Sequence, residues 1–428
     1  MHRAGWVAVL LTSLTVALAG GAAAVVLTQP AATVPSRPTG TGAVRTFTEQ
    51  LDESKVRATT TAQWARIARE NTVVVLNSWD FRLIPVLKRA NPAVQVWVYK
   101  DLSGVRSDDC TTSNGNCGNC PRGVTDRAFL SSGMGYCWVR RNHPDWLLDA
   151  AGSGRPFQFR GYPDTWETDY GNRAYQRQWV TNVLADVRGH GWDGVKIDNA
   201  LTIANAYGVA ARYPTDAAVQ AATYSALREV GPALHRAGVR FVANVGYATR
   251  FPGLWQRWLG PVDGLEQEFY LSYSTQPDAI GAAWGDYENE VSSCAAQHKM
   301  CWFHSGGYTD AVTSQTRGYV LASFVLATDG RQLLAVGDFP AVPLAPRWAL
   351  GRALGSMIEA GRAWRRSFAG GVTVVNPTRS HPVVYLERSY LTSAGRRVSA
   401  VVLPPVSGAI LRAPAGPGRP DPSTKAAT

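Results

Sequence analysis

The chain has 428 residues, of which 45% are hydrophobic and 18% are charged. This composition is typical of a globular protein with room for one large domain and shorter extensions. The formal net charge is +11, but the basic residues are scattered and form no run of five like charges. We therefore exclude a nucleic-acid partner. Fifteen Trp and sixteen Tyr favour a protein with ring surfaces for stacking, although most rings serve core packing.

The N-terminus has the pattern of a targeting segment. An apolar core from Trp6 to about Leu18 follows Arg3, and the small residues of 20–24 suit signal-peptidase cleavage. We expect residues 1–27 to be a signal peptide or, because the apolar stretch is long enough to span a bilayer, an uncleaved anchor. Residues 28–43 are rich in Pro, Thr and Gly and predict a flexible linker. The domain that follows is expected to be secreted, with membrane contact only through such an anchor.

The cysteines agree with an oxidising compartment, where an even number indicates disulfides. Four lie in a Gly/Asn-rich segment and two flank a short turn: Cys110, Cys117, Cys120, Cys137, Cys294 and Cys301. The spacing predicts a Cys294–Cys301 bridge, and the other four cysteines permit three connectivities. A zinc site at the Cys117-x-x-Cys120 pair is the alternative, but the remaining spacings match no familiar zinc finger, so we expect no metal.

From about residue 70 to 345, strand-like apolar runs alternate with longer helical or looped segments. Helical candidates include Tyr175–His190 and Asp216–Ala237. Eight runs predict an α/β fold, a closed (β/α)8 TIM barrel. The runs are Thr72–Trp79, Val94–Lys100, Pro156–Arg160, Gly194–Asp198, Arg240–Val245, Gly264–Phe269, Met300–His304 and Gln332–Val336. No Gly-x-Gly-x-x-Gly follows the first run, which excludes a dinucleotide-binding fold.

The C-terminal part changes character. Gly371–Asn376, Val383–Leu386 and Val398–Val402 indicate short antiparallel strands. The predicted organisation is a barrel over 44–350 and a small C-terminal β-domain over 351–412. A disordered tail is expected over 413–428.

The segment Gly191–Ala200 is the most informative. Side chains alternate along a strand, so Lys196 and Asp198 share one face of a short apolar strand, where two charges are expensive to bury. In a barrel, working groups collect at the carboxyl ends of the strands. A structural ion pair is the alternative explanation.

Polar residues at the other predicted strand ends extend this candidate site. They are Trp79, Asp80, Lys100, Asn199, Asn244, Glu266, Glu268, Tyr270 and His304. Carboxylates from opposed strands are what glycoside hydrolysis needs, one as nucleophile or base and one as proton donor. Each residue also has a structural explanation, such as a salt bridge, turn or helix cap.

The Lys196-x-Asp198 pattern resembles that of the α-galactosidase and α-glucosidase group of retaining barrels. His143–Trp146, Gly191–Asn199, Asp263–Phe269 and Phe368–Pro377 resemble, in the same order, the hypothetical glycosyl hydrolase barrels of bacteria. The resemblance implies a retaining glycosidase with Asp198 as nucleophile. The α-galactosidase group has an Asp as acid/base on its sixth strand, whereas the candidates here are Glu.

Glu266 and Glu268 share a face, and Glu268 lies nearer the end of the strand where substrate enters. We therefore expect Glu268 to be the acid/base and Glu266 to lie one layer deeper, paired with Lys196 or an Arg. A neighbouring carboxylate or burial would raise the pKa of the acid, as its role requires.

The sequence thus predicts an exported, monomeric glycoside hydrolase that binds a carbohydrate and needs no cofactor. Asp80, Trp79, Lys100, Lys196, Asn199, Asn244, Glu266, Tyr270 and His304 are the expected substrate-binding residues. The main alternative is a non-catalytic carbohydrate-binding barrel of the cell envelope. A metal-assisted deacetylase would need a His/Asp ligand cluster, which the scattered histidines do not suggest.

Overall fold

The computed structural model describes residues 44–112, 117–306, 312–337 and 350–414. The predicted signal segment, the linker and nearly all of the predicted tail lie outside these residues.

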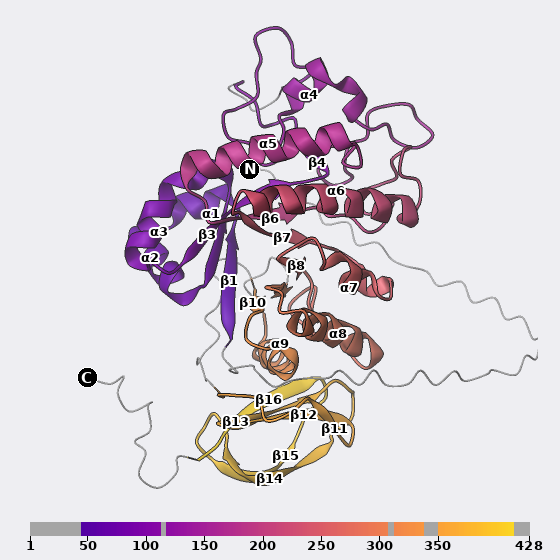
Figure 1. Ribbon diagram of the computed structural model, residues 1–428. Helices are drawn as coiled ribbons and strands as arrows, with labels where there is room; N and C mark the ends of the chain where they lie inside the picture. Colours follow the sequence, from indigo (N-terminus) through magenta and orange to yellow (C-terminus); the bar gives the residue numbers. More distant parts are fainter. Residues whose placement is uncertain (1–43, 113–116, 307–311, 338–349, 415–428) are drawn as a thin grey trace, which may run out of the picture. The chain divides into compact units, whose positions relative to one another are not determined.

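Eight parallel strands form a closed barrel (Figure 1), in the order β1-β10-β9-β8-β7-β6-β3-β2. They are β1 (Arg45–Gln50), β2 (Val73–Leu76), β3 (Gln95–Asp101), β6 (Gly194–Asp198), β7 (Arg240–Asn244), β8 (Gly264–Gln267), β9 (Trp302–Ser305) and β10 (Leu333–Val336). The predicted fold class, a (β/α)8 barrel with a small C-terminal β-domain, is confirmed.

One predicted strand is wrong, and one barrel strand was missed. Pro156–Arg160 is no barrel strand: Phe157 and Phe159 donate their backbone N–H groups to Leu148 and Thr165 of the same local excursion. The strand that closes the barrel is instead β1, whose polar composition gave no apolar run. Because one run was added and one was missed, β6 remains the fourth strand of the barrel.

The floor of the barrel is packed with aromatic rings. The Trp302 ring lies 4.8 Å from Phe47 and 5.0 Å from Trp97, between ring centroids. Gly194 makes room for this packing, because a Cβ there would lie 2.5 Å from the Trp97 indole. Water is thus excluded below the level at which the charged residues of β6 begin.

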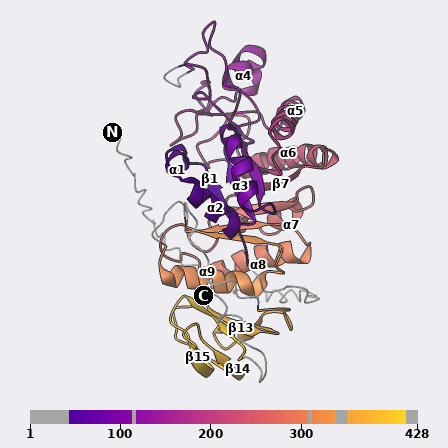
Figure 2. The ribbon, with the colours of Figure 1, turned by 90° about the vertical axis from the view of Figure 1, so that its left-hand side faces the viewer.

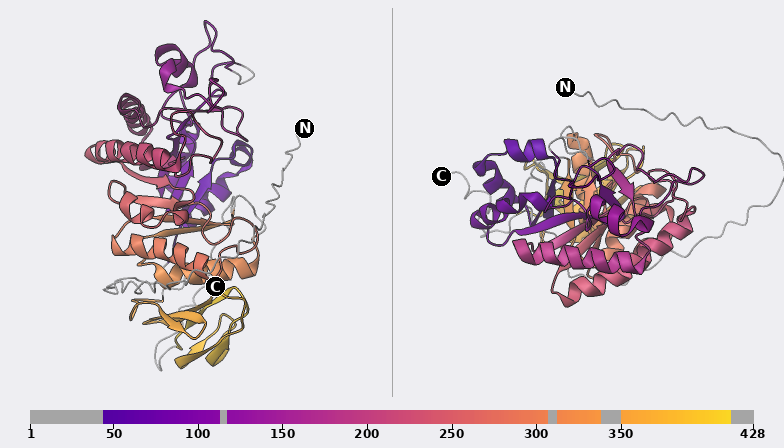
Figure 3. Two further views of the ribbon diagram at one scale, coloured as in Figure 1. Left: turned by 90° about the vertical axis from the view of Figure 1, so that its right-hand side faces the viewer. Right: turned by 90° about the horizontal axis from the view of Figure 1, so that it is seen from above.

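Helices follow most of the strands. They are α1 (Glu53–Ala58), α2 (Thr61–Glu70), α3 (Ile84–Ala90), α4 (Tyr136–Asn142), α5 (Arg173–His190), α6 (Asp216–Arg236), α7 (Leu254–Trp258), α8 (Ala282–Ala296) and α9 (Ser314–Ala327), with 3₁₀ turns η1 (Ser78–Leu83), η2 (Pro144–Trp146) and η3 (Ala248–Arg250). The two helices expected from the sequence, α5 and α6, lie side by side (Figure 3). Within the described residues, no helix combines the length and apolar character needed to cross a membrane.

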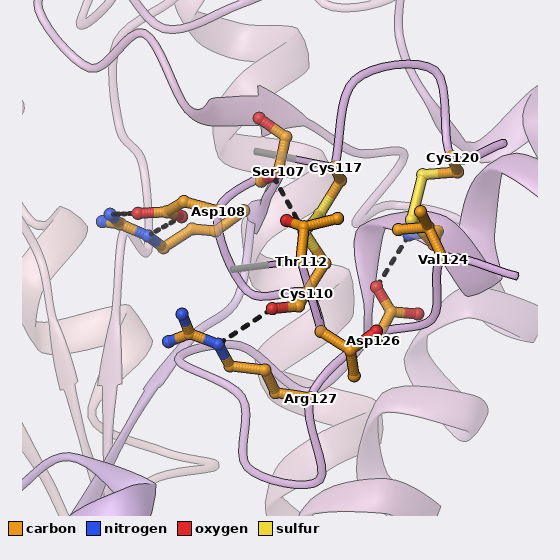
Figure 4. The surroundings of a disulfide bond; sticks show 12 residues. Ser107, Asp108, Cys110, Thr112, Cys117, Cys120, Val124, Asp126 and Arg127 are labelled. Atoms are coloured by element: carbon orange, nitrogen blue, oxygen red, sulfur yellow. Dashed lines mark hydrogen bonds and ion pairs between the residues drawn. A yellow bond between two sulfur atoms is a disulfide. The ribbon is translucent and has the colours of Figure 1, made fainter. Parts of the chain in front are cut away.

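A long excursion separates β3 from α5. It contains the antiparallel pair β4 (Gly104–Arg106) and β5 (Thr165–Glu167) and two disulfides, Cys110–Cys117 and Cys120–Cys137. Figure 4 shows the first of these held by Arg127, which donates to the Cys110 carbonyl. The four cysteines that the sequence offered as disulfide candidates are therefore paired, and their two bonds cross-link the excursion.

The third disulfide is Cys294–Cys301, the predicted pairing, and it links the end of α8 to the residue before β9. Among the described residues no cysteine is unpaired. The zinc alternative at Cys117 and Cys120 is wrong, since each sulfur is bonded to a different partner.

The C-terminal sheet has six strands in the order β11-β12-β13-β16-β14-β15. They are β11 (Ile358–Ala360), β12 (Ala363–Phe368), β13 (Gly371–Asn376), β14 (Val383–Leu391), β15 (Arg397–Val402) and β16 (Ser407–Arg412). Strands β13 and β16 pack on α9 (Figures 1 and 2). Buried Arg366 reinforces this junction by donating to the carbonyls of Leu326 and Thr328.

Candidate active site

Lys196 is the centre of a buried charge cluster in the barrel. Its side chain is 2% exposed, and Nζ lies 3.3 Å from Glu49 Oε1, 3.3 Å from Asp198 Oδ1 and 3.5 Å from Glu266 Oε2. The charge of one lysine thus faces three carboxyl groups. Burial alone would lower the pKa of Lys196, but the charges of Asp198, Glu266 and Glu49 raise it well above its ordinary value.

Asp198 is held in its ionised form. Its Oδ2 accepts a hydrogen bond of 2.6 Å from the Tyr99 hydroxyl, and its Oδ1 accepts one of 2.9 Å from the Asn244 amide. Burial acts to raise the pKa of Asp198, but the Lys196 charge and these two hydrogen bonds outweigh it and hold the pKa below its ordinary value. A carboxylate so poised is available as a nucleophile at neutral pH.

Asn244 connects Asp198 to Glu268. The same Nδ2 that donates to Asp198 Oδ1 at 2.9 Å donates to Glu268 Oε2 at 2.8 Å. Those two oxygens are therefore no farther apart than the sum of the two distances, 5.7 Å. Retaining glycosidases separate their carboxyl groups by about 5–5.5 Å, and inverting ones by about 6.5–9.5 Å.

Glu266 lies one layer below Glu268 and is fully buried. Burial first, and then the charge of Glu49, raise the pKa of Glu266 well above its ordinary value despite the opposing effect of Lys196. The protonated form of Glu266 is therefore favoured more than that of an ordinary glutamate. Glu268 is only partly buried, so of the two glutamates it is the one positioned to meet substrate.

Asp101, at the end of β3, and Asn199, just after β6, are hydrogen-bonded to each other beside Asp198. The Asn199 amide donates to Asp101 Oδ2 at 2.7 Å, and its oxygen accepts from the Tyr207 hydroxyl at 2.9 Å. Burial and the charge of Asp198 raise the pKa of Asp101 to about 7. Asn199 has a φ of 54°, a left-handed conformation that Asn tolerates, and its amide group is used to shape the loop.

Two of the predicted substrate-binding residues lie outside the barrel interior. Lys100 follows Tyr99, so it points to the helix layer, where Nζ lies 2.7 Å from Asp186 of α5. Tyr270 is fully buried between barrel and helices and donates a 2.6 Å hydrogen bond to Glu288 of α8. Neither residue is in a position to touch a ligand at the mouth.

Three further predicted residues lie at or beyond the ends of β2 and β9. Trp79 and Asp80 lie in η1 after β2, and burial raises the pKa of Asp80 to about 6. His304 lies inside the barrel on β9, with Nε2 at 3.1 Å from the Gly337 carbonyl and its ring edge-on to Phe47. Because β8 and β9 pair in parallel with Gln267 opposite Phe303, His304 lies on the strand next to the one that leads to Glu268.

Glu49 and Tyr99 contribute more to the site than the sequence indicated. Glu49 was missed because β1 was missed. Tyr99, whose hydroxyl donates to Asp198, was not among the residues predicted for the site. In the described part of the chain, no three His, Cys, Asp or Glu side chains are grouped so as to hold a metal ion.

A parallel eight-stranded barrel with paired carboxyl groups at its mouth is an architecture of glycoside hydrolases. The comparison with protein families agrees. The model of hypothetical glycosyl hydrolase family 15 matches residues 88–372, more than half of the chain, and the chain belongs to this family.

The chain also resembles several solved structures. A maltogenic α-amylase from Thermotoga neapolitana is 9% identical over 86% of this chain and 96% of its own, with a TM-score of 0.48. A family 27 β-L-arabinopyranosidase from Geobacillus stearothermophilus is 10% identical over 88% of this chain and 98% of its own, with a TM-score of 0.49. A family 36 α-galactosidase from the same organism is 14% identical over 86% of this chain and 55% of its own, with a TM-score of 0.48. No curated protein sequence matches the chain. Identities this low transfer no substrate to it.

Proposed function

We propose that this protein is an exported retaining glycoside hydrolase that acts on an oligo- or polysaccharide. Asp198 is the nucleophile and Glu268 is the acid/base. The observation that carries the proposal is the shared Asn244 amide, which keeps the nearer oxygens of the two carboxyl groups within 5.7 Å. That spacing favours direct attack by Asp198, because an inverting mechanism needs room for a water molecule between carboxylate and sugar.

The proposed reaction has two displacements. Asp198 attacks the anomeric carbon while Glu268 gives its proton to the departing glycosidic oxygen, which leaves a glycosyl ester on Asp198. Glu268, now ionised, takes a proton from water, whose oxygen attacks the same carbon and releases Asp198. Lys196 and Tyr99 stabilise the carboxylate both before attack and after release. The disulfides are compatible with export, since they persist in oxidising compartments.

The test is hydrolysis of a panel of α- and β-linked glycans by the wild type, Asp198→Asn and Glu268→Gln. Glu288→Gln, which alters a buried carboxyl group in the helix layer, is the matched control. We expect both site variants to lose at least about 10³-fold in kcat/KM, which matches the loss of a covalent or acid–base group. Proton NMR should show that the first product has the anomeric configuration of the substrate.

Two results would count against the proposal. Near wild-type rates in both site variants would remove the assigned roles. Glycan binding without turnover by any form of the protein would favour a carbohydrate-binding barrel instead.

A further inference from the structure

Three of the most exposed rings in the described residues belong to tyrosines near the barrel mouth. Tyr162, Tyr247 and Tyr273 are 54%, 46% and 63% exposed. Apolar rings are costly to leave in water without a partner. They come from three separate segments: the excursion before α5, the loop after β7 and the loop after β8. Each segment is linked, by ring contacts or by its place in the chain, to a residue beside or bonded to the carboxyl pair.

Tyr162 is connected to the Asp198 side. Its ring meets the Tyr207 ring edge-on at 5.5 Å, and Tyr207 stacks on Phe159 at 4.3 Å. The Tyr207 hydroxyl donates to Asn199, the residue after Asp198. The Tyr162 ring is therefore supported by the stacked rings of Tyr207 and Phe159, and Tyr207 is hydrogen-bonded to the residue that follows Asp198.

Tyr273 and Tyr247 are connected to the other side. The Tyr273 ring packs at 4.6 Å on Phe269, the residue after Glu268. Tyr247 lies three residues beyond Asn244 and has a φ of 61°, an uncommon backbone conformation for an aromatic residue. The Arg250 guanidinium lies 4.6 Å over its ring. Such strain is retained where the surroundings hold it in place, often at binding sites.

The electrostatics of Tyr162 agree with these contacts. Burial, followed by the charges of Glu268 and Asp198 and by the neighbouring phenols of Tyr273 and Tyr247, raises the pKa of Tyr162. Charges act strongly only at short range in a partly hydrated site. The Tyr162 phenol is thus under the electrostatic influence of both carboxyl groups and both other phenols.

We propose that Tyr162, Tyr247 and Tyr273 form binding subsites for the sugars that flank the reacting one. The substrate is then a glycan chain of several units rather than a simple glycoside. This inference rests on the proposed function. A sugar that reaches Asp198 and Tyr99 lies deep in the mouth, whereas the three exposed rings lie above it and meet only its neighbours. Flat ring faces suit the C–H faces of pyranose units.

The experiment compares short and long substrates of the sugar that the wild type cleaves best. The probes are its 4-nitrophenyl glycoside and its end-labelled oligosaccharides of two to six units. The variants are Tyr162→Ala and Tyr273→Ala, with Tyr385→Ala as the matched control. Tyr385 is a 78% exposed tyrosine on β14 of the C-terminal sheet.

For the long oligosaccharides we expect each rim variant to raise KM about tenfold, the loss of one stacked ring, with little change in kcat. On the 4-nitrophenyl glycoside the same variants should match the wild type, and Tyr385→Ala should match it on both. Binding of the six-unit chain to Asp198→Asn and to the double variants Asp198→Asn/Tyr162→Ala and Asp198→Asn/Tyr273→Ala should show the same loss without turnover.

The inference is wrong, while the proposed function stands, if the wild type cleaves the glycans but Tyr162→Ala and Tyr273→Ala behave like Tyr385→Ala on every chain length. It is also overturned if the wild type prefers the 4-nitrophenyl glycoside to the six-unit chain in kcat/KM. If the wild type cleaves no member of the panel, the proposed function fails first and this inference fails with it.

Discussion

The hydrogen bond from Tyr99 to Asp198 gives the sharpest prediction about the chemistry. In Tyr99→Phe the 2.6 Å bond to Asp198 Oδ2 is lost, while the ring remains. A hydrogen bond to a charged group contributes about 1.5–3 kcal/mol, and one pKa unit corresponds to about 1.4 kcal/mol. The pKa of Asp198, now held below its ordinary value, should therefore rise by about 1–2 units.

The assay is the pH dependence of kcat/KM, whose acid limb reports the nucleophile of the free enzyme. A protonated Asp198 cannot attack, so activity is lost as the pH falls through its pKa. A raised pKa moves that loss to higher pH, and the acid limb should shift upward by about 1–2 units. The alkaline limb, which reports the essential proton donor, should stay in place.

Tyr175→Phe is the control, because its hydroxyl donates to the Leu102 carbonyl rather than to a carboxylate. It should leave both limbs unchanged. An unmoved acid limb in Tyr99→Phe would show that this bond does not hold Asp198 ionised. An equal shift in the control would refute the reasoning in the same way.

Other buried groups give further predictions. Burial raises the pKa of Glu288 to about 8, so unfolding releases its proton at pH 7 and is favoured by about 3 kcal/mol. The free energy of unfolding of Glu288→Gln, measured in urea at pH 7, should therefore exceed that of the wild type by up to this amount. At pH 4, where the acid is largely protonated in both states, the two free energies should agree. An equal gain at both pH values would contradict this. Because Glu266 is fully buried one layer below Glu268, Glu266→Gln should keep kcat/KM within about tenfold. Lys196→Met should raise the pKa of Asp198 by about 1–3 units and move the acid limb accordingly. A loss in Glu266→Gln as large as that in Asp198→Asn would contradict the assignment of the deeper glutamate.

Much of the site was predictable because charged residues at strand ends are rare without a function. Lys196, Asp198, Asn244, Glu266 and Glu268 were all expected at the barrel mouth, and the structure brings them into contact through Lys196 and Asn244. The period of two along β6 and β8 placed these side chains on the inner face.

Two errors come from the same period of two, applied too loosely. Tyr99 and Lys100 are neighbours on β3, so only one of them can point inward, and Tyr99 pairs in register with Lys196. Lys100 therefore faces Asp186 of α5. Tyr270 follows the end of β8, where the chain leaves the barrel and the alternation no longer holds.

Glu49 could not be found from an apolar pattern. In β1, Phe47 and Glu49 point into the barrel, but the strand reads Arg-Thr-Phe-Thr-Glu-Gln and has no run of apolar residues. One of its two partners, β10, is far away in the sequence. Only closure of the barrel shows that this polar segment is a central strand.

The most direct test of the central claim is to trap the glycosyl ester on Asp198. A 2-deoxy-2-fluoroglycosyl fluoride of the sugar that the protein cleaves has a leaving group that needs no acid, and its fluorine slows release of the ester. Peptide mass spectrometry after such treatment should find one added fluorosugar on the peptide that contains Asp198, and none in Asp198→Asn. A fluorosugar attached to another residue, or hydrolysis with inversion and no adduct, would contradict the account.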